Sequence, residues 1–125
     1  MQRTKITAQQ NLDGYKEPGY LSFLRTLAVT SANMYDKAAR TFCRWCIANG
    51  KEVELSTLNM YIQYMHDEKK IQTSTLWSVM GRLRAFFEHG VWNLDGRPYN
   101  VKRDIPEVDH ALKQWQSRNQ SSLPK

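Results

Sequence analysis

The alternation of apolar and polar side chains is most informative in the segment 31–49, which reads SANMYDKAARTFCRWCIAN. At a period of 3.6 residues, the apolar side chains gather on one face and the cations on the opposite face. The apolar face comprises Tyr35, Ala38, Ala39, Phe42 and Cys46, with Trp45 and Ile47 at its edges. The polar face comprises Asn33, Lys37, Arg40 and Arg44, with Asp36 nearby but off this face. The pattern predicts a helix that buries one side and presents three cations along about two turns.

A shorter helix is predicted before this segment. Pro18 suits the first turn of a helix, and Leu21 and Leu24 follow at helical spacing in a pattern that ends near Val29. Ser31 is the predicted N-cap of the central helix, because a serine hydroxyl can accept a hydrogen bond from a free backbone N–H in the first turn. The two helices are therefore expected to follow one another with a short link.

Two further helices are predicted after Gly50, a residue suited to ending the central helix. The first covers 57–69, capped by Ser56, and its buried stripe comprises Leu58, Tyr61, Ile62 and Met65. The second covers 73–89 and has the most regular helical period in the chain. Its apolar positions are Leu76, Val79, Met80, Leu83, Phe86 and Phe87.

A last helix is predicted after the connection 91–103. Asp104 and Glu107 have the spacing of a capping box, and Pro106 falls in the first turn. One apolar face then comprises Ile105, Val108, Leu112 and Trp115. Together, these predicted helices form an all-α, compact single-domain bundle of four to five helices.

The expected domain organisation is one helical core between two polar ends. Residues 1–17 are polar and lack a helical period, so we expect a flexible basic arm there. Residues 18–118 form the helical domain, and a chain of 125 residues is long enough for one such core. Residues 119–125 read as a tail or interdomain linker.

The net charge of the chain indicates the class of partner that it binds. Lys and Arg number 18 and Asp and Glu 12, which gives a net charge of +6 and a pI near 9.5. A basic domain of this size suggests a polyanionic partner, nucleic acid before an acidic membrane surface. No segment approaches the ~18 apolar residues of a membrane helix, and the first residues do not form a secretory signal. The expected location is intracellular, nuclear in a eukaryote and otherwise the cytoplasm or nucleoid.

Cysteine and histidine positions bear on metal and redox chemistry. Cys43 and Cys46 have CxxC spacing, but a zinc site needs a second ligand pair, and His66, His89 and His110 are far apart. The pair lies inside a helix rather than at the helix N-terminus typical of redox motifs. Core cysteines are the favoured interpretation, and metal binding and redox chemistry are the alternatives.

Catalytic signatures are missing from the sequence. It holds no G-x-S-x-G, no P-loop and no Gly-rich dinucleotide turn. Carboxylates such as Asp67, Glu68, Glu107 and Asp109 sit at predicted helix ends, where capping and the helix dipole explain them. We therefore expect a protein without enzymatic activity, with no catalytic residue, no metal and no small-molecule cofactor.

Three groups of residues are candidates for binding an anionic backbone. The row Lys37, Arg40 and Arg44 has one-turn spacing that matches phosphates or guanine edges, although an ordinary solvated face is the alternative. The cluster Thr73, Ser74 and Thr75 can seat a phosphate on a helix N-terminus, or simply cap that helix. The third group is Lys102 and Arg103, just before the last helix.

The helical pattern resembles the N-terminal core-binding (SAM-like) domain of tyrosine recombinases, the phage integrase family, including its eukaryotic crypton-type relatives. The resemblance covers roughly 18–118. The residues that carry it are Ser31, Tyr35, Phe42, Trp45 and Gly50, then Thr57 and Tyr61, then Ser74, Thr75, Leu76, Leu83, Arg84, Phe86 and Gly90, and finally Val108 and Leu112. Most are core and cap positions, so the order of elements and the Tyr35–Phe42–Trp45 spacing carry the most weight.

The resemblance implies a helical domain that clamps one side of duplex DNA, with possible further copies of the chain on the same DNA. The positions that match the family's DNA-facing surfaces are Asn33, Lys37, Arg40 and Arg44, and Thr73, Ser74, Thr75, Ser78 and Arg82. Recombinase chemistry belongs to a separate C-terminal domain, whose H-x-x-R motif is absent here because His66 and His110 are each followed three residues later by Lys. The expected function is non-catalytic binding of double-stranded DNA.

The alternative function is a helical module for protein interaction or oligomerisation. Trp77 and Trp92 are its candidate anchors, because neither fits a buried stripe cleanly.

Overall fold

The computed structural model describes residues 7–90 and 104–122 and confirms the predicted all-α class. Within these residues it contains helices and no strand. The helices are α1 (Ala8–Leu12), α2 (Pro18–Arg25), α3 (Val29–Ala48), α4 (Leu55–Asp67), α5 (Thr73–Gly90) and α7 (Pro106–Ser122). None of them combines the length and hydropathy needed to span a bilayer.

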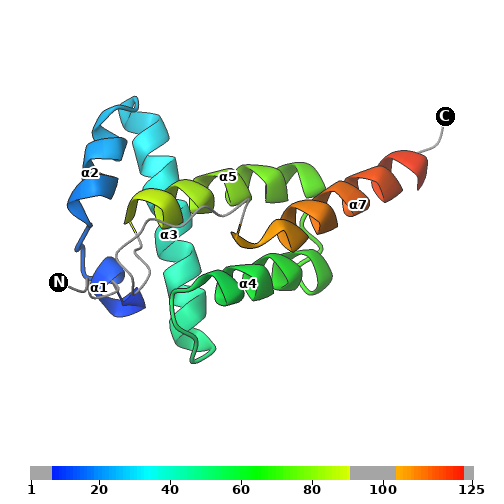
Figure 1. Cartoon of the computed structure of the whole chain (residues 1–125), viewed down its shortest axis with the longest axis horizontal. Helices are drawn as coiled ribbons and strands as arrows, with labels where there is room; N and C mark the ends of the chain where they lie inside the picture. Colours follow the sequence, from blue (N-terminus) through cyan, green and yellow to red (C-terminus); the bar gives the residue numbers. More distant parts are fainter. Residues whose placement is uncertain (1–6, 91–103, 123–125) are drawn as a thin grey trace.

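The helices α3 and α5 organise the bundle. In Figure 1, α3 crosses α5, with α1 and α2 beside α3 on one side and α4 and α7 on the other. α3 packs against α1, α2, α4 and α5, and α5 packs against α2, α3, α4 and α7. Every described helix therefore contacts at least one of these two.

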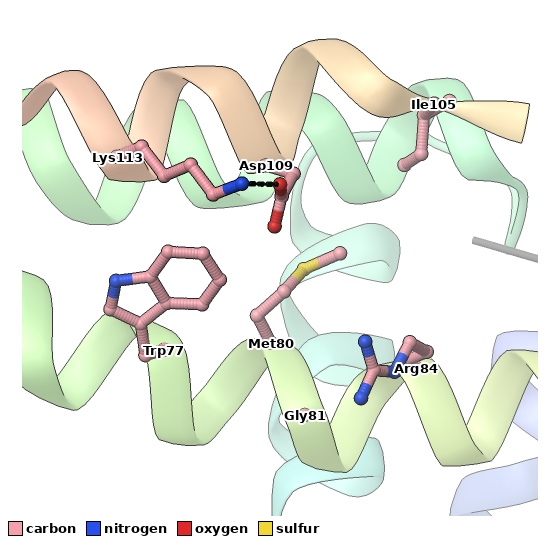
Figure 2. A pocket seen from close by; sticks show the side chains of 7 residues that line it. All are labelled: Trp77, Met80, Gly81, Arg84, Ile105, Asp109 and Lys113. Carbon is pink, nitrogen blue, oxygen red and sulfur yellow. Dashed lines mark ion pairs between the residues drawn. The ribbon is translucent and has the colours of Figure 1, made fainter. Parts of the chain in front are cut away.

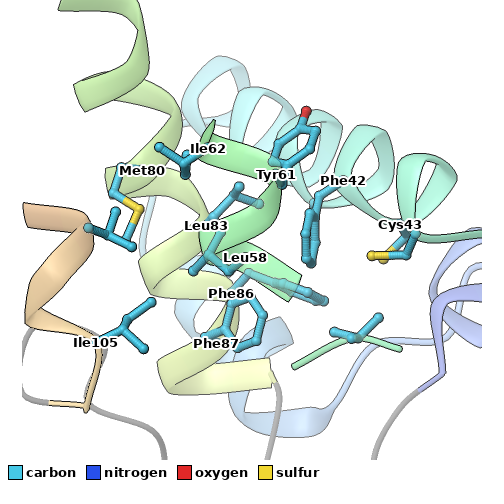
Figure 3. Packing of buried hydrophobic residues seen from close by; sticks show 14 of the residues in the cluster. Phe42, Cys43, Leu58, Tyr61, Ile62, Met80, Leu83, Phe86, Phe87 and Ile105 are labelled. Carbon is cyan, nitrogen blue, oxygen red and sulfur yellow. The ribbon is translucent and has the colours of Figure 1, made fainter. Parts of the chain in front are cut away.

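The core lies where α3, α4 and α5 meet (Figure 3). The ring of Phe42 lies 5.2 Å from that of Tyr61 on α4 and 5.8 Å from that of Phe87 on α5, measured between centroids. The predicted stripes are confirmed, because the side chains of Leu58, Ile62, Leu76, Leu83 and Phe86 are all at most 1% exposed. Burial of such side chains contributes about 1.5–3 kcal/mol each and dominates the stability of the bundle.

α2 joins the same core from the other side. Tyr20 on α2 meets Phe86 on α5 edge to face at 5.4 Å, and Phe23 stacks on His89 at 4.5 Å. A Cβ placed on Gly19 would lie 3.0 Å from the carbonyl oxygen of His89, so α2 approaches the end of α5 closely. The imidazole of His89 therefore serves as a packing surface.

α7 is fastened to two helices by aromatic side chains. The indole of Trp115 stacks on His66 of α4 with ring centroids 3.7 Å apart. Trp77 of α5 donates its indole N–H to Gln116, Nε1 to Oε1 3.2 Å. The proposed anchor Trp77 is thus engaged within the chain, whereas Trp92 lies outside the described residues.

Several predicted helix ends are corrected. The prediction of Ser31 as an N-cap was wrong, because α3 begins at Val29, with Ala28 at the cap position. Ser56 is not the cap of α4 either, because that helix begins at Leu55 after Glu54, and the Ser56 hydroxyl donates to the Glu54 carboxylate at 2.9 Å. At the C-terminal end, α7 continues to Ser122, into the predicted tail 119–125.

The prediction that Gly50 ends the central helix is confirmed. Gly50 has φ +62°, the left-handed region that favours glycine. Its N–H donates to the carbonyl of Ile47 at 3.2 Å, and the N–H of Lys51 donates to that of Cys46 at 2.8 Å. These two bonds form a Schellman motif and satisfy carbonyls that the helix end would leave free.

Residues 8–12, which were expected to belong to a flexible arm, form α1. A capping box begins this helix: the Thr7 hydroxyl accepts from the Gln10 N–H at 3.1 Å, and the Gln10 side chain accepts from the Thr7 N–H at 2.8 Å. Ala8 and Asn11 are buried against the bundle. Among the described residues, the helical domain therefore begins at Thr7 instead of residue 18.

The link that follows α4 contains a residue with a strained backbone. Lys70 has φ 54°, a conformation that costs a non-glycine residue about 1–2 kcal/mol. We expect Lys70→Gly to raise the free energy of unfolding by up to about 1 kcal/mol, because the relieved strain exceeds the extra chain entropy of glycine. Urea denaturation measures this. Lys69→Gly removes the same charge from an unstrained position and should lower stability; a loss of equal size in both variants would contradict the argument.

Candidate nucleic-acid interface

The outer face of α3 carries exposed cations. Asn33, Lys37 and Arg44 are exposed, and Lys37 and Arg44 form no ion pair with a described carboxylate. They lie seven residues apart, about 10 Å along the helix axis. Two cations two turns apart on one face suit the repeated charges of a polyanion.

The one acidic residue of α3 is neutralised from outside the helix. Asp36 pairs with Lys16, Nζ to Oδ1 3.4 Å, and both side chains are about a quarter exposed. Lys16 belongs to the segment between α1 and α2, and periodicity could not indicate this pairing. Because the carboxylate of Asp36 is matched locally, the positive charge of Lys37 and Arg44 stands largely unopposed on the outer face.

The position of Arg40 corrects the predicted row of three exposed cations. Its guanidinium is half-buried and donates to two backbone carbonyls of α1, Nη2 to Leu12 at 3.1 Å and Nη1 to Asn11 at 3.4 Å. These carbonyls belong to the C-terminal end of α1, where the helix dipole favours a cation. In this structure Arg40 therefore fastens α1 to α3.

The start of α5 carries the second predicted group, Thr73, Ser74 and Thr75, of which two residues are exposed. Thr73 is only 4% exposed and has partners within the chain, so the prediction that it seats a phosphate is corrected. Ser74, Thr75 and Ser78 are exposed, and the Ser78 hydroxyl donates to the carbonyl of Ser74 at 3.4 Å. With the half-buried Arg82 they follow the 3–4-residue spacing of one helix face.

The two remaining patches are separate. α5 crosses α3 at the Phe42–Phe87 contact, and Thr75 precedes Phe87 by 12 residues, about 18 Å of helix. The face of α5 that carries Ser74, Thr75, Ser78 and Arg82 therefore begins well away from the cations of α3. The third predicted group, Lys102 and Arg103, lies outside the described residues.

A groove lies between α5 and α7 (Figure 2). Its volume is about 330 Å³, and its walls include Trp77, Met80 and Ile105. Its carboxylate, Asp109, is paired with Lys113 at 3.0 Å. The guanidinium of Arg84 lines the groove as well and forms no ion pair with Glu88, one turn further along α5. The described lining contains no Ser, Thr, Cys or His side chain.

The buried cysteines confirm the core interpretation. The thiols of Cys43 and Cys46 are free and fully buried in the bundle. Burial raises the pKa of Cys43 to about 12 and that of Cys46 to about 11. Thiolates, the reactive and metal-binding form, are therefore disfavoured. Within residues 7–90 and 104–122, no three His, Cys, Asp or Glu side chains are grouped to hold a metal ion.

Sequence reasoning missed the docking of α1, although one signal for it was present. Thr7 and Gln10 have the T-x-x-Q spacing of a capping box. The interaction of Arg40 with α1 spans 28 and 29 residues, and such long-range interactions leave no trace in local periodicity.

Comparisons of this chain with known protein families, with curated proteins and with solved structures gave no match.

The raised thiol pKa values predict alkaline destabilisation. In the unfolded chain a cysteine ionises near pH 8.5, whereas the folded chain holds its protons to about 11 and 12. Above about pH 8.5 the unfolded state therefore binds fewer protons, and stability falls by up to about 1.4 kcal/mol per pH unit per thiol. Urea midpoints from pH 8 to 11 should decline less steeply in the Cys43→Ala, Cys46→Ala double variant. Parallel declines would show that the thiols do not cause the effect.

Proposed function

We propose that this chain is a non-catalytic module that binds double-stranded DNA with the outer face of α3. The observation that carries the proposal is that α3 has exposed cations without a described partner, whereas its carboxylate is paired. Lys37 and Arg44 are exposed without a described partner, while Asp36 is paired with Lys16. The net charge of +6 attracts a polyanion over a longer range.

The face of α5 supplies a second contact region in this proposal. Ser74, Thr75 and Ser78 offer hydroxyl groups and Arg82 a cation along one face. Hydroxyl and guanidinium groups of this kind position a protein on phosphates and carry little sequence information by themselves. Along α5, this region extends from Thr75, about 18 Å from the α3 crossing, to Arg82, about 8 Å from it.

The resemblance to the core-binding domain of tyrosine recombinases supports the same proposal. In that family the domain binds DNA and the catalytic residues belong to another domain, so this chain would be a binding half. A single module with a few phosphate contacts binds weakly and with a strong dependence on salt. DNA binding would place the protein in the nucleus or the nucleoid. Interaction with other proteins has less support, because Trp77 is bonded to Gln116.

Removing the two exposed cations of α3 tests the main site. In the Lys37→Ala, Arg44→Ala variant, we expect the slope of log affinity against log salt to become flatter by about 2 units, since the variant neutralises two fewer phosphates. Fluorescence anisotropy with a labelled duplex measures this slope.

The matched control for this experiment is the Arg25→Ala, Lys69→Ala variant, which removes the same net charge from two other exposed positions. It should keep nearly the wild-type slope. Equal flattening in both variants would show that net charge alone, rather than this face, attracts the DNA.

A charge introduced on α5 tests the second region. Ser78→Glu places a carboxylate on the proposed face, and we expect about tenfold weaker duplex binding near 0.1 M salt, because the new charge repels the nearest phosphate. Ser22→Glu, on the exposed surface of α2, is the control. An equal loss in both variants, or none in either, would remove α5 from the interface.

A further inference from the structure

α1 packs closely along α3, but it buries few large apolar side chains there. α1 has five residues, too few to be stable alone. Its apolar contribution consists of Ala8, which is buried, and Leu12, which is partly buried against the core. The guanidinium of Arg40 adds hydrogen bonds of 3.1 and 3.4 Å to its last carbonyls. Segments with so little buried apolar surface open locally more easily than the core.

The docked position of α1 also carries a cost. Asn11 is 2% exposed, and its side-chain oxygen Oδ1 has no hydrogen-bond partner. Burying an unsatisfied polar atom costs the desolvation that a hydrogen bond would otherwise offset. Undocking returns this amide to solvent, so part of the cost of opening is recovered.

The connection to α2 allows α1 to leave by itself. Gly14 follows α1 with φ +100°, a conformation that glycine adopts without strain. Lys16 lies beyond this glycine and is held by Asp36 at 3.4 Å. The N–H groups of Gly14 and Tyr15 cap α1 by bonding the carbonyls of Asn11 at 3.1 Å and Gln10 at 3.0 Å. These bonds lie on the α1 side of Lys16, so α1 can undock and unwind without breaking the Lys16–Asp36 pair.

We propose that α1 is a detachable cover on the DNA-binding helix, and that duplex phosphate and the carbonyls of α1 compete for the guanidinium of Arg40. This inference rests on the proposed function. A phosphate offers Arg40 a charge-assisted, bidentate partner in place of two neutral carbonyls. Once released, Arg40 stands one turn from both Lys37 and Arg44 and completes a row of three cations. The free protein therefore exposes two cations of this row, and the DNA-bound protein uses all three.

The test weakens α1 without changing charge. Thr7→Ala with Gln10→Ala removes both bonds of the capping box. We expect a gain in duplex affinity of about three- to tenfold at low salt, because a larger fraction of molecules has the binding-competent arrangement. Ser22→Ala with Gln114→Ala removes a hydroxyl and an amide from exposed positions elsewhere and should leave affinity unchanged. Arg40→Ala added to the capping variant should abolish the gain.

Hydrogen exchange gives a second, independent readout in the wild-type protein. The amides of Asn11, Asp13, Gly14 and Tyr15 are bonded to carbonyls of residues 7–11. Duplex DNA should lower their protection, whereas the amides of Thr26 and Leu27, bonded at the end of α2, should not lose protection. Unchanged or increased protection of the four amides would overturn the proposal that α1 is a detachable cover. The same holds if the Thr7→Ala, Gln10→Ala variant binds duplex DNA no more tightly than the Ser22→Ala, Gln114→Ala control.

Failure of the two proposals can be told apart. If the wild-type chain binds duplex DNA through Lys37 and Arg44 but the capping variant gains nothing, only the cover is wrong. If no variant binds duplex DNA at low salt, the proposed function is wrong and the competition for Arg40 is overturned with it.

Discussion

The crossing of α3 and α5, marked by the contact of Phe42 with Phe87, is the constraint on which the bundle depends. The two rings lie 5.8 Å apart, and both side chains are inaccessible to solvent. α4 completes this contact through Tyr61. Because every other described helix packs on α3 or α5, truncating either ring would loosen the whole arrangement, at a cost of about 3–5 kcal/mol for a buried phenylalanine.

The same crossing determines which surfaces remain for function. α3 is covered by α1 and α2 along one side and by α4 and α5 along another. Only its outer face stays open, and this is where Lys37 and Arg44 lie. The charge on that face is governed by a residue outside the helix, because Lys16 neutralises Asp36. The proposed DNA-binding surface is therefore a property of the assembled bundle, not of the helix sequence alone.

The sequence predicted the long helices well because their burial follows a strong period. Leu58, Leu76, Leu83 and Phe86 recur at helical spacing and are buried as expected. The helix ends were less predictable, since neighbouring polar residues compete as caps: the hydroxyl of Ser56 bonds Glu54 instead of capping α4. For the candidate site, the outward direction of Lys37 and Arg44 followed from the period. The capture of Arg40 by α1 did not, because that interaction is long-range and α1 has almost no apolar pattern.

The packing of Tyr20 on Phe86 has a consequence for how the chain acquires its fold. The rings meet at 5.4 Å although they belong to opposite ends of the first ninety residues. A ribosome releases Tyr20 long before Phe86, and closing so large a loop carries an entropic cost before the rings can stabilise one another. The contact of α2 with α5 must therefore wait until α5 has been synthesised. Until then, α3 in the nascent N-terminal half has one apolar side exposed. Cellular chaperones can bind this exposed apolar surface.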